Sequence, residues 1–288
     1  MELKINNLSK QYNKNIWALK DFSLNINDGI VGLLAPNGAG KTTLMKILAT
    51  VMRPTSGEVQ CNGRNIFSLG SEYRNVIGYL PQDFGVYPDF KADDFLNYFA
   101  VLKGLDPKTA KKRIDYLLNV VSLTSVRHRK LKTYSGGMKQ RMGIAQALLN
   151  DPKILIIDEP TVGLDPEERI KFRNLLSELS DNRIVVLSTH IVSDIEAIAT
   201  SIAFMKDGML LEYTTPQKSL EMLEGKVYQT LTDVKGANEL KKQYIVSNTQ
   251  NKKNGVLVRV VGDKPCNEAQ LVEPTLEDVY LHYYRAMV

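Results

Sequence analysis

The segment that most constrains the fold is residues 30–48, where an apolar run leads through a glycine-rich turn into an apolar helical pattern. The run at 30–34 predicts a buried strand, and Leu44, Ile47 and Leu48 share one face of the predicted helix. Between them, the sequence PNGAGKTT allows a tight turn whose backbone N–H groups can face phosphate oxygens. The positive end of the following helix dipole would face the same oxygens. Strand, turn and helix in this order predict a loop that cradles nucleotide phosphates.

The side chains of this loop suit that chemistry. Lys41 can reach the β- and γ-phosphates, and the Thr42 hydroxyl can ligate Mg²⁺. The full motif has glycine six residues before the lysine, where this chain has Ala35, a departure that concerns the first turn of the loop. The predicted phosphate-binding residues are Asn37, Gly38, Ala39, Gly40, Lys41, Thr42 and Thr43.

A second apolar run, at 154–157, ends in two carboxylates, Asp158 and Glu159. Its uniform apolarity predicts a strand covered on both faces, as in a parallel sheet. An aspartate at the end of such a strand, downstream of a phosphate loop, can hold Mg²⁺ through water. The glutamate after it can orient or deprotonate an attacking water, so the pair predicts phosphoryl transfer to water.

Composition and patterning place these motifs in an α/β chain. The 288 residues are 43% hydrophobic and 24% charged, which predicts a soluble globular chain of one or two domains. No apolar run reaches the length of a membrane span, and the first residues do not resemble a secretory signal. The net charge of +5 does not by itself indicate a nucleic-acid partner. Cys61 and Cys266 are expected to be thiols in a reducing compartment.

The pattern along the chain predicts strands at 3–8, 22–26 and 184–187, and helices at 93–102, 108–121 and 166–179, with another after Ser135. The basic run 127–130, which contains His128, is expected to be an exposed loop. From about residue 220 the rhythm weakens, with strands predicted at 227–231 and 255–261 and a helix at 274–284. The predicted core of this tail is Met222, Leu223, Val227, Leu276, Val279 and Tyr283.

Residues 134–141, YSGGMKQR, resemble the signature motif of the ATP-binding-cassette (ABC) ATPases, with Tyr134 for the usual Leu and Met138 for the usual Gln. The other motifs follow in that family's order: the phosphate loop, Gln82 in YLPQD, the signature, ILIIDEP, GLD at 163–165, and His190. The resemblance covers roughly residues 1–215. It implies a nucleotide-binding domain at 1–219, with a mainly parallel sheet, an antiparallel β region and a helical subdomain at about 87–150. Residues 220–288 then form a small α+β accessory or regulatory domain.

The resemblance also assigns roles to residues outside the loop. Ser135 can cap a helix whose N–H groups, with Gly136 and Gly137, form a second anion site. The family implies that this site binds the γ-phosphate held by another subunit, so that two chains sandwich two ATP molecules. The further residues implied are Gln82, which senses Mg²⁺ and the attacking water; Asp165, which couples the two sites; His190, which contacts the γ-phosphate; and Tyr12, which stacks on adenine, with Trp17 as the alternative ring.

The resemblance therefore implies an ATP- and Mg²⁺-dependent hydrolase that powers transport through separate integral membrane subunits, with a homodimer of cassettes expected. The subunit would lie in the cytoplasm, on the inner face of the cell membrane, with no nucleic acid as partner. The helical segment near Tyr87 would dock the membrane subunit. The segments DFGVY at 83–87 and PTLEDVYLHYY at 274–284 look similar to the drug- and antibiotic-export branch.

Two other functions compete with this prediction. One is a soluble ABC ATPase acting on nucleic acid or the ribosome, which usually has two cassettes in one chain or a long coiled-coil insertion, and this chain has neither. The other is a non-enzymatic nucleotide-gated module, which the presence of both Glu159 and His190 disfavours. For the tail, three roles stay open: stabilising the dimer, regulating it, or covering apolar surface.

Overall fold

The computed structural model describes residues 1–285, which divide between Tyr213 and Thr214 into two compact units. The first unit contains every predicted motif of the nucleotide site. The predicted domain boundary after residue 219 falls inside helix α9 (Pro216–Glu221), which lies wholly in the second unit. Residues 286–288 of the predicted accessory domain lie outside the described residues.

Two sheets organise the first unit. The six-stranded sheet has the order β10-β9-β3-β8-β7-β6, and its β3, β6, β7, β8 and β9 pair in parallel. The second sheet has the order β2-β1-β4-β5 and is antiparallel. The strands are β1 (Leu3–Asn13), β2 (Ile16–Ile26), β3 (Gly29–Leu34), β4 (Ser56–Cys61), β5 (Arg64–Asn65), β6 (Ile77–Leu80), β7 (Ile154–Asp158), β8 (Ile184–Thr189), β9 (Ser201–Lys206) and β10 (Met209–Thr214).

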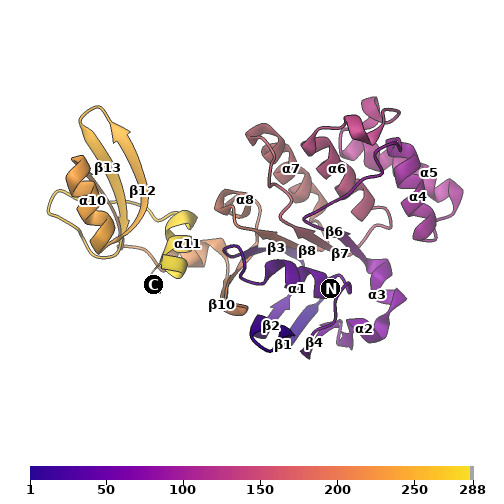
Figure 1. Ribbon diagram of the computed structural model, residues 1–288, viewed down its shortest axis with the longest axis horizontal. Helices are drawn as coiled ribbons and strands as arrows, with labels where there is room; N and C mark the ends of the chain where they lie inside the picture. The colour runs from indigo at the N-terminus through magenta and orange to yellow at the C-terminus, as the bar shows by residue number, and fades with distance from the viewer. Residues whose placement is uncertain (286–288) are drawn as a thin grey trace. The chain divides into compact units, whose positions relative to one another are not determined.

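Helix α1 (Lys41–Leu48) fills the space between the two sheets, as Figure 1 shows. Its buried Leu44, Ile47 and Leu48 join one apolar core with Ile156 of β7 and Val59 of β4. The burial of this face confirms the helical pattern that the sequence predicts. Because α1 is packed on both sides, the glycine-rich turn at its beginning has a fixed position relative to both sheets.

Helices α6, α7 and α8 lie on the other side of the six-stranded sheet, and α4 and α5 lie beyond α6 (Figure 1). Helices α4 and α5 pack together and against α6. The remaining helices of this unit are α2 (Ile66–Leu69), α3 (Ser71–Val76), α4 (Ala92–Leu102), α5 (Pro107–Val120), α6 (Gly136–Ala147), α7 (Pro166–Leu179) and α8 (Val192–Glu196), with 3₁₀ turns η1 (Thr124–Val126) and η2 (Leu131–Thr133). The predicted helices at 93–102, 108–121 and 166–179 are thus present.

The second unit is an antiparallel sheet of order β12-β13-β11-β14 with three helices. One apolar cluster of this unit contains Ala237 of α10 together with Val246, Val256, Val258 and Val260 of β12 and β13. Its elements are α9, β11 (Val227–Thr232), α10 (Val234–Gln243), β12 (Ile245–Lys252), β13 (Gly255–Val261), β14 (Gln270–Leu271) and α11 (Leu276–Arg285).

The predicted core of this unit needs one correction. Leu223, Val227, Leu276, Val279 and Tyr283 are buried, but Met222 is 41% exposed. Met222 directly follows α9, and its sulfur accepts a hydrogen bond from the Tyr283 hydroxyl at 3.4 Å. The neighbouring Leu223, 1% exposed, takes the core position instead.

Candidate functional site

The phosphate loop joins β3 to α1 and is shaped by two glycines in the left-handed region. Gly40 has φ +104°, and a Cβ added there would lie 2.2 Å from the carbonyl oxygen of Ala18, so only glycine fits. Gly38 has φ +81° with open space around it. Ala35 is buried and is not among the residues of positive φ, which explains why alanine is accepted where the motif has glycine.

Lys41 lies in the centre of this loop with its ammonium group fully engaged. Its Nζ donates to the carbonyl oxygens of Ala35 at 2.8 Å and Pro36 at 3.2 Å, and lies 3.0 Å from Oε1 of Glu159. Both charged side chains are about 95% buried, since their exposed fractions are 5% and 4%. The structure therefore brings together the lysine that the sequence places at the phosphates and the glutamate that it places at the attacking water.

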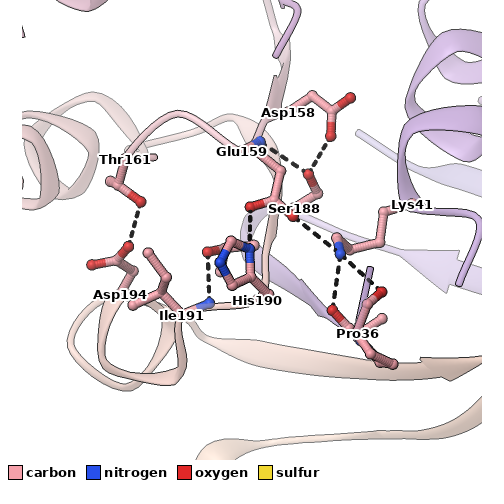
Figure 2. A network of polar contacts seen from close by, with 11 residues as sticks. Pro36, Lys41, Asp158, Glu159, Thr161, Ser188, His190, Ile191 and Asp194 are labelled. Atoms are coloured by element: carbon pink, nitrogen blue, oxygen red, sulfur yellow. Dashed lines mark hydrogen bonds and ion pairs between the residues drawn. The ribbon is translucent and has the colours of Figure 1, made fainter. Parts of the chain in front are cut away.

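Glu159 itself follows β7 in a left-handed conformation, with φ 48°. Its N–H donates to both the carbonyl and the hydroxyl oxygen of Ser188 in β8. A non-glycine residue in this region costs of order 1–3 kcal/mol. These two bonds hold the turn in place, and the side chain points at Lys41 and His190 (Figure 2).

His190 lies directly after β8, beside the adjacent strand β7. Its Nδ1 is 2.8 Å from Oε2 of Glu159, so the two oxygens of this carboxylate are divided between Lys41 and His190. The three residues come from the carboxyl ends of three parallel strands, β3, β8 and β7, which meet at the same edge of the sheet. Ligand sites of open α/β sheets are found at this edge.

Asp158 ends β7 as a fully buried carboxylate. One oxygen accepts a hydrogen bond of 2.5 Å from Ser188, while Oδ2 is buried with no hydrogen-bond partner among the described residues. Burial raises the pKa of this carboxyl, while hydrogen bonds with Ser188 and Thr42 act in the opposite direction. A buried carboxylate oxygen without a partner, beside a threonine hydroxyl, fits the oxygen ligands that Mg²⁺ prefers.

The predicted adenine and water-sensing residues line a cavity that also contains the phosphate loop, Lys41 and Glu159. It has a volume of about 500 Å³ and lies over the phosphate loop. Both Tyr12 and Trp17 line it, so either ring could stack on a base, and the Tyr12 hydroxyl lies 3.2 Å from that of Thr43. Its other lining residues are Ile16, Ala18, Asn37, Gly38, Gly40, Lys41, Thr42, Thr43, Gln82 and Glu159.

The signature residues do not line this cavity. Ser135 is the N-cap of α6 and accepts a hydrogen bond from the Met138 N–H at 3.2 Å, as the sequence predicts. Asp165 caps α7 in the same way, accepting from the Glu168 N–H at 2.8 Å. Both capping side chains are exposed, and a side chain at Gly136 would meet nothing within 4 Å.

Two groups of ion pairs around this region were not evident in the sequence. Glu168 of α7 pairs with Arg141 of α6 at 3.3 Å and lies against Gly137. In the basic run, Arg127 binds Asp93 and Asp115, and the exposed His128 lies 3.4 Å from Asp93. The run is therefore largely neutralised within the chain, and such pairs between distant residues leave no local pattern in the sequence.

Together, the glycine-rich loop, the Lys41–Glu159–His190 network and the buried Asp158 define a phosphate-loop nucleotide hydrolase with an α/β core. A family model described as "ABC transporter" matches residues 19–162. The chain belongs to this family, as an ABC-type ATPase and ATP-binding subunit.

Similar proteins agree with this assignment. The ABC transporter ATP-binding protein YxlF of Bacillus subtilis is 40% identical, over 72% of this chain and 68% of its own length. The linearmycin resistance ATP-binding protein LnrL of the same species is 33% identical, over 82% and 76%. ABC transporter A family member 8 of Dictyostelium discoideum is 35% identical, but this chain spans only 26% of it.

A solved structure resembles the fold closely. It is the ATP-binding cassette MJ0796, described as a dimer in a post-hydrolysis state bound to ADP and Pi. Its TM-score is 0.67 at 29% identity, covering 74% of this chain and 98% of that one. Within residues 1–285, none of the helices combines the length and apolarity needed to cross a bilayer.

Proposed function

We propose that this ATPase is the motor subunit of an ABC exporter, in which two copies bind two ATP·Mg²⁺ between them and drive separate membrane subunits from the cytoplasmic face. The observation that carries the proposal is that the signature helix begins away from the cavity of the phosphate loop. Lys41 lies in the cavity, whereas Ser135 and Gly136 present a capped helix end elsewhere. A helix N-terminus with free N–H groups binds anions, and a second copy's γ-phosphate would complete it.

In this arrangement each residue has a defined task. Lys41 and the loop N–H groups bind the phosphates, and Thr42 and Asp158 would hold Mg²⁺, which supplies charge neutralisation on the phosphate oxygens. Gln82 lines the same cavity as Glu159, which supports a contact with the attacking water. Glu159 takes a proton from that water. His190 contacts the γ-phosphate and also orients the Glu159 carboxylate through the 2.8 Å contact. Asp165 and the signature face the other copy.

The composite site is tested with Ser135→Asp. Aspartate caps a helix as well as serine does, so α6 is expected to stay intact, while its charge repels a phosphate. In a Glu159→Gln background, where ATP should trap the dimer, Ser135→Asp is expected to bind ATP as a monomer. Light scattering and a fluorescent nucleotide measure the two properties separately.

The controls separate the two anion sites. Ser135→Thr should still dimerise, as should Ser125→Asp, at an exposed serine of the same subdomain. Lys41→Ala should lose nucleotide binding itself. A Ser135→Asp chain that dimerises with ATP as well as its parent would show that the signature does not touch the nucleotide.

For the membrane partner, we propose a docking surface on the helical subdomain formed by the exposed aromatic rings of Tyr87, Phe90 and Tyr98. The ring centroids of Tyr87 and Phe90 lie 5.0 Å apart, and those of Tyr87 and Tyr98 lie 5.7 Å apart. All three are more than a third exposed. This surface follows Gln82 in the chain, which connects it to the catalytic cavity. The name of the linearmycin resistance relative supports export as the direction.

We expect Tyr98→Glu to release the chain from membranes without weakening ATP binding, because a charge would be buried in the interface. Tyr116→Glu is the matched control, since Tyr116 is also an exposed tyrosine, on α5. Membrane fractionation and co-purification from detergent extracts measure the association. If the wild-type chain co-purifies with RNA and with no integral membrane protein, the transport role is wrong.

A further inference from the structure

The loop after Glu159 is joined to the segment after His190 at a second, buried point. The Thr161 hydroxyl donates a hydrogen bond of 2.5 Å to Oδ2 of Asp194, and both residues are 2% exposed. Thr161 lies two residues beyond Glu159, and Asp194 lies four residues beyond His190. Figure 2 shows this bond on the far side of His190 from Lys41. A hydrogen bond to an ionised carboxylate is stronger than a hydrogen bond between two neutral groups.

A third segment reaches the same carboxylate. Arg173 of α7 donates to the carbonyl oxygen of Ser193 at 2.9 Å, and its Nη1 lies 3.9 Å from Oδ1 of Asp194. That Oδ1 is buried without a hydrogen-bond partner among the described residues. Arg173 is therefore the nearby cation that offsets the buried charge, and it lies on the helix that Asp165 caps.

Helix α8 packs on the sheet through its buried Ile195, which lies against Gly32 of β3, and the contacts of Asp194 add polar links to the neighbouring segments. It has five residues and no side-chain cap, and a helix so short gains little stability from its own hydrogen bonds. His190 lies just before it, in a turn that the Thr189 hydroxyl supports by accepting from the Ile191 N–H at 3.0 Å. The strand pairing of β7 with β8 ends at Asp158 and Ser188, so it does not fix the loops that follow.

We infer that Asp194 is a positioning residue for hydrolysis: through Thr161 and Arg173 it holds the loop of Glu159 and the loop of His190 in register, and links both to α7. The Glu159–His190 contact connects the two loops near the strands, and the Thr161–Asp194 bond connects them again further along the chain. Asp194 acts through His190 and does not meet the nucleotide. The inference rests on the proposed roles of Glu159 and His190.

The first test observes the histidine directly, without nucleotide. The chain has three histidines, so ¹⁵N-labelled imidazoles give few signals, and the signal missing in His190→Ala identifies that ring. Thr161→Val removes the donor at constant shape and should move the His190 ring shifts, while Thr161→Ser should leave them as in wild type. His128 and His282 serve as internal controls. Unchanged His190 shifts in Thr161→Val would overturn the inference.

The second test is kinetic. Thr161→Val should lower kcat about 10- to 100-fold, the effect expected of a misplacement near 1 Å, with ATP affinity retained and Thr161→Ser restoring the rate. In a His190→Ala background, Thr161→Val should have no further effect, because the two residues act together. Additive losses would show a merely structural role. If Thr161→Val folds poorly, Asp194→Asn replaces it, since it keeps the acceptor and removes the charge facing Arg173.

The outcomes also separate this inference from the proposed function. If His190→Ala hydrolyses ATP at the wild-type rate, the proposed role of His190 is wrong and the inference falls with it. If His190→Ala loses turnover while Thr161→Val and Asp194→Asn keep theirs, the role of His190 stands and only the positioning inference is overturned.

Discussion

Glu159→Gln is expected to lower ATP turnover by about 10²- to 10⁴-fold while ATP binding is retained, since removal of a general base has effects of this size. The amide has the shape of the carboxylate and can still accept a hydrogen bond from Lys41, whose Nζ lies 3.0 Å from Oε1. It cannot take a proton from water. Steady-state phosphate release and equilibrium binding of a fluorescent nucleotide measure the two effects.

Glu167→Gln provides the matched control for this substitution. Glu167 is an exposed glutamate in the first turn of α7, where it pairs with Lys171. Because exposed ion pairs contribute little, Glu167→Gln should turn over ATP at close to the wild-type rate. Wild-type turnover in Glu159→Gln would remove this residue from catalysis. A loss of ATP binding in the same variant would instead show that the carboxylate acts by organising Lys41.

The second large effect is expected in the second unit, where Asp278→Asn should destabilise the fold by about 3–5 kcal/mol, the cost of breaking a buried ion pair. Asp278 is fully buried, and Arg259 of β13 donates to it from Nε at 3.0 Å and from Nη2 at 2.7 Å. The N–H and hydroxyl of Thr275 donate to the same carboxylate, which fixes the beginning of α11. Asparagine leaves the guanidinium buried without a counter-charge.

Hydrogen exchange on the full chain is the appropriate measurement, because it reports on the second unit separately. The amides of β13 and α11 should exchange faster in Asp278→Asn and those of β7 should not. Asp263→Asn, at an exposed aspartate of the same unit, serves as the control. Equal protection in both variants would mean that the Arg259–Asp278 pair contributes little to this unit.

The same pair predicts a dependence on pH. Burial alone would raise the pKa of Asp278, but the hydrogen bonds from Arg259 and Thr275 outweigh it and hold the pKa below its usual value. Because its pKa is lower in the folded state, the ionised Asp278 stabilises the fold at pH values above its unfolded-state pKa of about 3.9. This stabilisation is lost as the pH falls through the folded-state pKa. The second unit of the wild type should therefore lose protection in acid, and Asp278→Asn should lose less.

Much of the secondary structure could be predicted because its signals are local. Helix α7 has its limits at 166 and 179 as expected, since an aspartate cap followed by proline marks its beginning. Strand β12 was not predicted, because the polar run SNTQNK has no strand pattern and becomes a strand only through pairing with β13. Helix α10 was missed for a related reason, since Ala237 is its only fully buried residue.

In the candidate site, too, some features could be predicted from local sequence signals and others could not. Lys41, Glu159 and His190 could be placed together because their strands end at one edge of a parallel sheet. The Thr161–Asp194 bond, the Arg173 contact and the Arg259–Asp278 pair could not, because they join residues of ordinary type across 19 or more positions. Such contacts depend on how loops and helices pack, which periodicity does not record.

The contact of Glu168 with both Arg141 and Gly137 has a mechanical consequence. It joins the signature helix α6 to the beginning of the Asp165-capped helix α7, so we expect the two helices to move together. In the proposed dimer, the loops that precede these two helices would therefore meet the other copy as one rigid unit. A displacement of either loop would then displace both. We expect Glu168→Ala to make ATP-driven dimerisation less cooperative before it lowers the rate of ATP hydrolysis.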